Sequence, residues 1–179
     1  KLQQVEIPTS LVKLNQATFE CSRALQSVYI RGTDPIVGLF DFSNIVFFGD
    51  YCCDGNSKMT NVILNPNLTG VITKEVFKDN DLTEIEIPVG VTLIKNKAFM
   101  QTYSLKVITI LGMETILESD DVFNGNSTCP AIKAKAGSKA AEFAKANGVA
   151  LPDHLIPNEW GGPQDESYEN FKEYLYNLY

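Results

Sequence analysis

The sequence predicts a solenoid built from stacked units of about 23 residues. One apolar pattern, L-x-x-V/I-x-I/L, opens at Leu2, Leu25, Met59, Leu82 and Leu105, with offsets of 23, 34, 23 and 23 residues. A weaker sixth copy follows at Ile132 and Ala134. A fixed period in the twenties is typical of solenoids, in which each unit buries its apolar face only against its neighbours.

Each copy of the pattern predicts a short strand. Alternate side chains of a strand face opposite sides, so the paired apolar positions should point inward. Strands stacked at this interval form a parallel ribbon along one face. The inward pairs are Val5/Ile7, Val28/Ile30, Val62/Leu64, Ile85/Ile87 and Ile108/Ile110.

A turn and an aromatic residue complete each unit. Proline and glycine mark the turn, as in Pro88 and Gly90, and the chain then reaches a phenylalanine before the next strand. The recurring aromatic residues are Phe19, Phe42, Phe77, Phe99 and Phe123. With this phasing, the single long offset places an irregular insertion at about 43–58, predicted to be an extra strand or hairpin on the array edge, or a protrusion that contacts a partner.

An alternative phasing is also open. It puts Cys53 at the aromatic position and moves the irregular segment to 31–42. The first phasing is preferred because it preserves Phe42 and Val37.

The period stops after residue 132. Residues 133–151 are predicted to form a capping strand and helix, with Ser138 as the N-cap and Gly148 just past the helix end. Residues 152–179 read as a proline-flanked linker and an acidic amphipathic helix. Its apolar residues recur three and four positions apart, and it should fold back on the array, dock a partner or fray. The repeats themselves span 1–132.

Charge and composition exclude several classes of protein. The net charge is −7, and residues 152–179 hold six acids against one base. No basic face of the kind that nucleic acid needs is visible, so nucleic-acid binding is not expected. No stretch approaches the length of a membrane span. Because the chain opens directly on a repeat strand, we expect a leader or earlier segment to have been removed or to lie outside this sequence.

The residues of the chain offer little for catalysis. The one histidine, His154, lies in the linker, the sequence holds no glycine-rich phosphate loop, and no calcium-loop pattern is complete. Enzyme activity, a metal site and a cofactor are therefore not expected. The four cysteines, Cys21, Cys52, Cys53 and Cys129, fit no zinc or disulfide framework and are predicted to be buried free thiols, with a disulfide as the alternative.

The units "LQQVEIPTSLVKLNQATFECSRA" and "LTEIEIPVGVTLIKNKAFMQTYS" resemble BspA-like leucine-rich repeats, and "AIKAKAGSKAAEFAKANGV" resembles the terminal element of that family. The resemblance covers about residues 1–150. It implies a right-handed leucine-rich-repeat superhelix and a secreted or surface location, often in host-associated bacteria. It also implies adhesion to extracellular matrix proteins, host cells or other bacteria, and it brings no catalytic residues.

The strand register then predicts a partner surface. Positions between the inward pairs should face outward along the concave ribbon, which solenoids use for binding. Tyr29 and Ile63 fit a solvated face less well than the charged residues do. The candidates are Gln4, Glu6, Tyr29, Arg31, Asn61, Ile63, Glu84, Glu86, Thr109 and Lys133, with Ser27, Asn65 and Val107 at equivalent outward positions.

Three functions follow from this surface. The first is a non-enzymatic module that binds a protein at the cell surface. The second is a structural spacer within a larger surface protein, which would show no saturable binding. The third is a carbohydrate-binding accessory, for which Tyr29, Tyr51 and Tyr103 are the candidate stacking residues.

Overall fold

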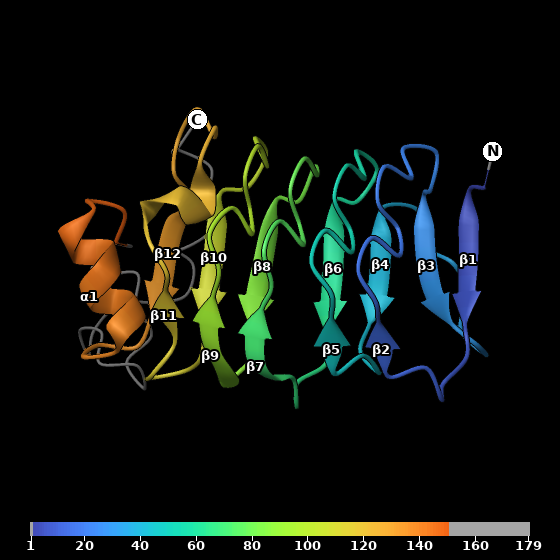
Figure 1. The fold of residues 1–179 in the computed structure, drawn as a ribbon, viewed down its shortest axis with the longest axis horizontal. Coiled ribbons are helices and arrows are strands. Elements are labelled where there is room, and N and C mark those ends of the chain that lie inside the picture. Colours follow the sequence, from blue (N-terminus) through green and yellow to red (C-terminus); the bar gives the residue numbers. More distant parts are fainter. Residues whose placement is uncertain (1, 151–179) are drawn as a thin grey trace, which may run out of the picture.

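The protein is an elongated array of parallel strands, described here for residues 2–150 of a computed structural model. One face is a ribbon whose strands lie side by side along the molecule (Figure 1). The strands of this ribbon are β1 (Gln4–Ile7), β3 (Ser27–Ile30), β4 (Leu39–Phe42), β6 (Asn61–Leu64), β8 (Glu84–Ile87), β10 (Val107–Ile110) and β12 (Ala131–Ala134).

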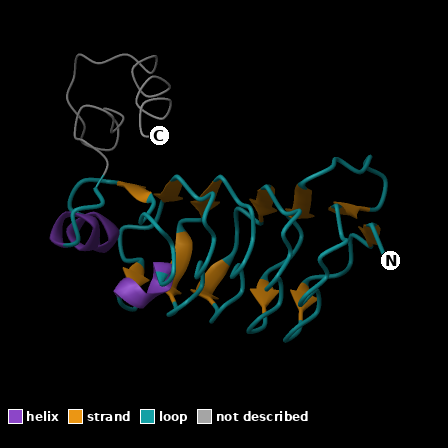
Figure 2. Cartoon of the chain, turned by 90° about the horizontal axis from the view of Figure 1, so that it is seen from above, coloured by secondary structure: helices purple, strands orange, loops and turns teal. Residues whose placement is uncertain are grey.

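Strands of two to five residues form a second face, which we call the back sheet. Successive back strands are parallel, as in the pairing of β7 with β9, so the chain makes a turn of a solenoid in each unit. Figure 2 shows the strands along two sides of the array with loops between them. The back strands are β2 (Lys13–Leu14), β5 (Phe47–Phe48), β7 (Thr69–Ile72), β9 (Gly90–Ile94) and β11 (Ile116–Leu117).

Loops close each unit on a third side, the loop face, which comprises residues 15–23, 49–57, 73–81, 95–103 and 118–126. Backbone hydrogen bonds join successive loops, as in Phe77 N to Ala98 O (3.0 Å) and Phe99 N to Val122 O (3.0 Å). The loops need left-handed backbone at repeated positions. Non-glycine residues take that conformation at Ala17, Cys21, Tyr51, Glu75, Asp79, Lys97 and Gln101. The last loop contains the short 3₁₀ helix η1 (Asp120–Phe123).

A line of phenyl rings fills the core from end to end. Phe77 and Phe99 stack with centroids 5.6 Å apart, and Phe99 and Phe123 with centroids 6.1 Å apart. Towards the N-terminus the line continues through Phe48, Phe42 and Phe19, with neighbouring centroids 5.5–6.2 Å apart. We call these six rings the aromatic spine; burial of such large side chains is a main stabilising contribution to a solenoid.

The preferred phasing of residues 31–58 is wrong, because Leu39–Phe42 is a ribbon strand. β4 pairs with β6 over its whole length, which sets Phe42 against Leu64. Residues 43–58 then form an ordinary unit with back strand β5, and Cys53 occupies the aromatic position, where its N–H donates to Val76 O. The irregular segment is 31–38, a short connection from β3 to β4. The alternative phasing is therefore correct for Cys53, but its irregular segment of 31–42 wrongly includes strand β4.

The aromatic ladder explains this error. Phe42 does belong to the spine, but it reaches the spine from a strand position rather than from the loop face. The apolar pattern of the sequence does not distinguish a phenylalanine that enters the spine from a strand from one that enters it from the loop face.

The C-terminal end is covered by the helix α1 (Lys139–Ala146), which lies beyond β12 at the end of the array (Figure 1). Ser138 is its N-cap and accepts a hydrogen bond from Ala141 N at 3.1 Å, as predicted. Ala140 and Ala144 are buried on the helix face that packs on the array. The predicted linker and tail helix lie outside the described residues.

The prediction of buried thiols is correct for two of the four cysteines. Cys52 and Cys53 are buried, whereas Cys21 and Cys129 are exposed, and all four are free. Cys21 lies on the loop face in a left-handed conformation (φ 54°), and its side chain is exposed there rather than packed beneath the turn. Burial, then the neighbouring Cys52, raises the pKa of the Cys53 thiol well above its usual range, so this thiol stays protonated.

Candidate binding surface

The ribbon places two rows of side chains on its outer face. The register fixes the first row through the pairs Glu6–Tyr29, Asp41–Ile63, Glu86–Thr109 and Thr109–Lys133. The second row follows from the pairs Gln4–Ser27, Leu39–Asn61, Glu84–Val107 and Val107–Ala131. Residues from units that are far apart in sequence are thereby aligned on one surface.

Most of the predicted surface residues are accessible. Gln4, Glu6, Arg31, Asn61, Ile63, Glu84 and Glu86 are exposed, and Tyr29, Thr109 and Lys133 are half-buried. Ser27, Asn65 and Val107 are buried, so the outward positions are not all open. Ser27 and Val107 are short side chains on interior strands of the ribbon, flanked on both sides by neighbouring strands.

The structure divides the candidates into three groups. Glu6, Tyr29 and Arg31 gather at the N-terminal end, where Arg31 Nε donates to Glu6 Oε1 at 2.8 Å. Asn61, Ile63, Glu84, Glu86 and Thr109 gather in the middle of the ribbon. Gln4 and Lys133 stand on the first and last strands, too far apart in the array to act together.

Sequence reasoning missed the two outward residues of β4. Asp41 belongs to the first row, beside Ile63, and Leu39 belongs to the second row, beside Asn61. The missing signal is the alternation Leu-Phe-Asp-Phe at residues 39–42, which is a strand pattern of period two. Asp41 Oδ1 accepts a hydrogen bond from Ser43 N at 2.9 Å, so this carboxylate is partly committed to its own turn.

The ribbon is interrupted between β6 and β8. Among the described ribbon strands, these are the neighbours that are not joined by strand pairing. At two other places in the ribbon, the residue after a strand donates its N–H to the carbonyl at the end of the preceding strand: Arg31 to Ile7 (2.8 Å) and Leu111 to Ile87 (3.1 Å). Pro88 holds that position after β8 and has no N–H to give to Leu64.

Two hollows lie along this interruption. We call the interruption together with its two hollows the ribbon break. The upper hollow lies near the start of β6 and β8. It has a volume of about 270 Å³ and is lined by Asn61, Val62, Glu84, Ile85, Glu86 and Thr109. The lower hollow, of about 420 Å³, is lined by Val62, Ile63, Leu64, Pro66, Glu86, Pro88, Val89 and Leu111. They share Val62 and Glu86, so they form one groove along the strands, polar at the upper end and apolar at the lower end.

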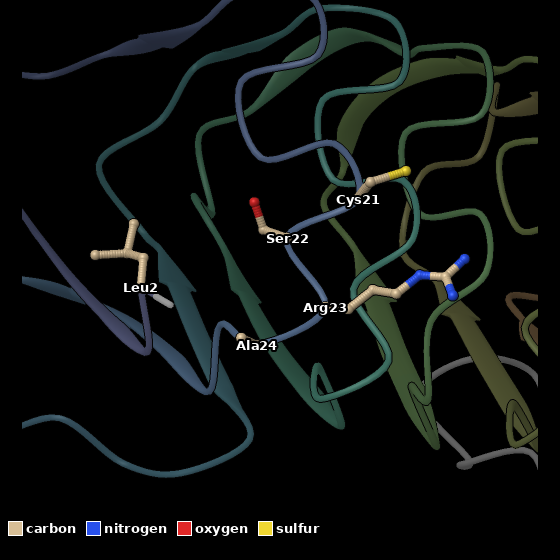
Figure 3. A pocket seen from close by; sticks show the side chains of 5 residues that line it. All are labelled: Leu2, Cys21, Ser22, Arg23 and Ala24. Carbon is tan, nitrogen blue, oxygen red and sulfur yellow. The ribbon is translucent and has the colours of Figure 1, made fainter.

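Another hollow lies at the N-terminal end, with a volume of about 390 Å³. Figure 3 shows Leu2 on one side of it and the segment 21–24 on the other, with the Cys21 and Arg23 side chains directed away from Leu2. Its lining therefore offers one large apolar residue and few converging polar groups, which makes it a weaker candidate than the ribbon break.

The loop face holds a partly buried charge cluster. Lys78 Nζ lies 2.9 Å from Glu75 Oε2 and 3.3 Å from Asp54 Oδ2. Burial raises the pKa of Glu75, but the hydrogen bond and charge of Lys78, with Lys74 and Lys97 nearby, lower it more, so this pKa lies below its usual value. Burial raises the pKa of Asp54, which Lys78 offsets only in part.

This cluster joins neighbouring loops and points to structural stabilisation rather than chemistry. Within residues 2–150, no group of three or more His, Cys, Asp or Glu side chains is arranged to hold a metal ion. Nor does any helix there have the length and apolar character to cross a membrane.

Comparison with protein families decides the identity of the array. The model of the BspA-type leucine-rich repeat region matches six copies of the repeat, over residues 1–106 and 46–141. The chain belongs to the BspA-type leucine-rich repeat family. Leucine-rich repeats are typically non-catalytic scaffolds, and a comparison with curated proteins gave no match.

A solved structure shares the fold of this BspA-type array. It is a leucine-rich cell-surface protein from Faecalibacterium prausnitzii A2-165, with a TM-score of 0.61 and 18% sequence identity. The match covers 83% of this chain and 35% of that one, so this chain corresponds to about a third of the length of the bacterial protein. At this identity the likeness concerns the fold alone.

Proposed function

We propose that this chain is a non-enzymatic binding module of a secreted or cell-surface protein, and that it holds a protein partner on its ribbon face. The partner class is an extracellular matrix protein, a host-cell protein or a surface protein of another bacterium. Membership of the BspA-type family and the surface location named for the bacterial structure support this location.

One observation carries the proposal: exposed apolar side chains stand on the ribbon beside a groove. Ile63 is 42% exposed on β6, and Val89 is 66% exposed where the chain leaves β8. Exposed apolar groups that line a concavity are typical of protein-binding surfaces. A spacer would have no need of them at the interruption in its ribbon.

The aromatic side chains give less support to carbohydrate binding. Tyr29 lies on ribbon strand β3, Tyr51 lies on the loop face with Lys74 Nζ 5.6 Å from its ring centroid, and Tyr103 lies in a later loop. Tyr29 is on a different face from Tyr51 and Tyr103, and these two loop-face residues are separated by the unit whose loop spans 73–81, so the three rings do not form one stacking platform.

The test is saturable binding of the purified chain to immobilised fibronectin, fibrinogen, laminin and mucin. Ile63→Lys should weaken binding at least tenfold, because it puts a charge in the apolar end of the groove. Ile116→Lys is the matched control, since Ile116 is 44% exposed on the back sheet. Equal losses in both variants would contradict a ribbon-face site, and no saturable binding to any of the four proteins would favour the spacer function.

A further inference from the structure

We propose that the ribbon break binds an extended protein segment in which a lysine or arginine stands two or four residues away from a large apolar residue. This inference names the partner chemistry of the proposed binding function and rests on it.

The lower end of the groove suits an apolar side chain. Ile63, Val89 and Leu111 line it together with Pro66 and Pro88, and its volume of about 420 Å³ accommodates a leucine or phenylalanine side chain with room for the adjoining backbone. Pro66 and Pro88 bring no side-chain donor or acceptor, so a polar group placed beside them, away from Glu86 at the boundary with the upper hollow, would lose hydrogen bonds to water without replacement.

The upper end of the groove suits a cation. Glu84 and Glu86 are both exposed on β8 and both line the upper hollow, and neither hollow is lined by a lysine or an arginine. Charge complementarity therefore favours a basic side chain and disfavours an acidic one. Asn61 and Thr109 supply neutral polar groups on either side.

The spacing within the groove selects an extended segment. Glu84 and Glu86 are two residues apart on one strand, so their side chains share a face at about 7 Å separation. An extended peptide laid along β8 presents every second side chain at the same interval. If the basic residue lies opposite Glu86, the residue two positions further along the peptide lies over the apolar end. If it lies opposite Glu84, the residue four positions further along does.

The missing pairing gives this segment a place to lie. β6 and β8 each have a ribbon neighbour on one side only, so the backbone edges that face each other across the break are not engaged in strand pairing. Extended peptides are commonly recognised through such edges, with side-chain pockets providing the selectivity. The bond from Thr83 N to Thr60 O (3.3 Å) closes the break at the upper end, so the segment would lie over the groove and reach the unpaired strand edges only below that bond, without separating the units.

The experiment uses the full chain with isotope-labelled isoleucine methyl groups and three synthetic peptides. The first peptide is Lys-Ser-Lys-Ser-Leu-Ser, the second replaces both lysines by glutamate, and the third replaces the leucine by serine; each is also made in reverse order. We expect the first, in one of its two orders, to shift the Ile63 and Ile85 methyl signals saturably. The glutamate and serine peptides should bind at least fivefold more weakly.

Two variants locate the contacts. Glu84→Gln/Glu86→Gln should weaken the basic peptide about fivefold at low salt, which corresponds to one partly exposed ion pair, and the loss should shrink as salt is raised. Ile116→Ala on the back sheet should leave the affinity unchanged and serves as the control. Unchanged affinity in the Gln variant, or equal binding of the glutamate peptide, would overturn the proposal.

The two proposals fail separately. If the chain binds a matrix protein and Ile63→Lys abolishes binding, but the basic peptide shifts no methyl signal, the binding function stands and this partner chemistry is wrong. If the basic peptide binds at Ile63 while none of the four matrix proteins does, the groove chemistry stands and the adhesion function is wrong.

Discussion

The unit at residues 39–60 and the unit that opens with β8 fill the same core by different means. In the second unit, Phe99 enters from the loop face and stacks on Phe77 and Phe123 with interplanar angles of 16° and 21°. In the first, the loop position holds Cys53, and Phe42 and Phe48 enter from the two strands, edge to face at 73°. Both units therefore place phenyl rings in the aromatic spine, although the positions that supply those rings differ.

The largest expected effect comes from removing the spine ring of the unit that opens with β8. Phe99→Ala removes a fully buried ring that stacks on two others and should lower the free energy of unfolding by about 3–5 kcal/mol. Cys53→Ala, at the equivalent position, should cost about 1 kcal/mol, because a small side chain is already present there. Chemical denaturation of both variants measures the difference, and similar losses would show that the two units do not differ as described.

A second test places an aromatic residue at the loop-face position of the unit at residues 39–60. Cys53→Phe should destabilise the protein by about 1–3 kcal/mol, since Phe42 and Phe48 already occupy the spine. Adding Phe42→Leu should recover most of that loss. Leucine is chosen because Leu64 holds the equivalent position in the next unit. Unfolding of the single and double variants gives the coupling energy, and simple additivity of the two changes would count against shared space.

The charge cluster on the loop face also distinguishes the two units. Lys78, in the unit that opens with β6, reaches back to Asp54 of the unit at residues 39–60, whereas the equivalent position in the unit that opens with β8 is Met100. Glu75→Gln should cost about 1–2 kcal/mol at pH 7, because it replaces a charged hydrogen bond in a nearly buried site.

The pH dependence of this loss has a definite sign. The pKa of Glu75 is lowered in the folded protein, so its contribution is present above the unfolded value of about 4.3 and disappears as pH falls through the folded value. Thermal unfolding from pH 7 to pH 3 should therefore show the wild type and Glu75→Gln converging at the acid end. A difference that stays constant over this range would mean that the glutamate charge is not responsible.

Asp54 should behave in the opposite way. Its pKa is raised on folding, so the contribution of its protonated form is present at low pH and is lost as pH rises through the folded value. Asp54→Asn should consequently change stability at pH 7 by less than about 1 kcal/mol. A loss larger than that of Glu75→Gln in the same thermal scans would contradict this assignment.

The smallest effect is expected at the exposed pair on the ribbon. Arg31→Ala removes the ion pair with Glu6, in which both side chains are well exposed, and should change the free energy of unfolding by about 0.5 kcal/mol or less. Raising the salt concentration should reduce even this difference. Denaturation at two salt concentrations measures it, and a loss above 1 kcal/mol would show that the N-terminal units depend on this pair.

Much of the fold could be predicted from the sequence, because stacking repeats the same local rules. The 23-residue period fixes which strands can be neighbours, and the alternation in Ile85 and Ile87 fixes which side faces inward. The helix cap at Ser138 was equally predictable, since a capping serine and a run of alanines act within one turn.

The candidate surface was predictable only in part. Ile63, Glu84 and Glu86 follow from the alternation alone, but the lower wall of the groove, with Val89 and Leu111, lies beyond the strands and has no signature in the pattern. Asp41 was missed because its strand was assigned to a loop. Ser27 was placed on the open surface, although neighbouring strands bury it.

By itself, the sequence determined the solenoid, its period, its inward faces and its capping helix, because each depends on residues close together in the chain. The tertiary structure alone decided where the short connection at 31–38 falls and which phenyl rings share the spine. It also decided that the ribbon breaks between β6 and β8. These features depend on how the side-chain volume and the backbone donors of one unit fit the next: Phe42 replaces a ring that Cys53 cannot supply, and Pro88 lacks the N–H that Arg31 and Leu111 donate to the preceding strand.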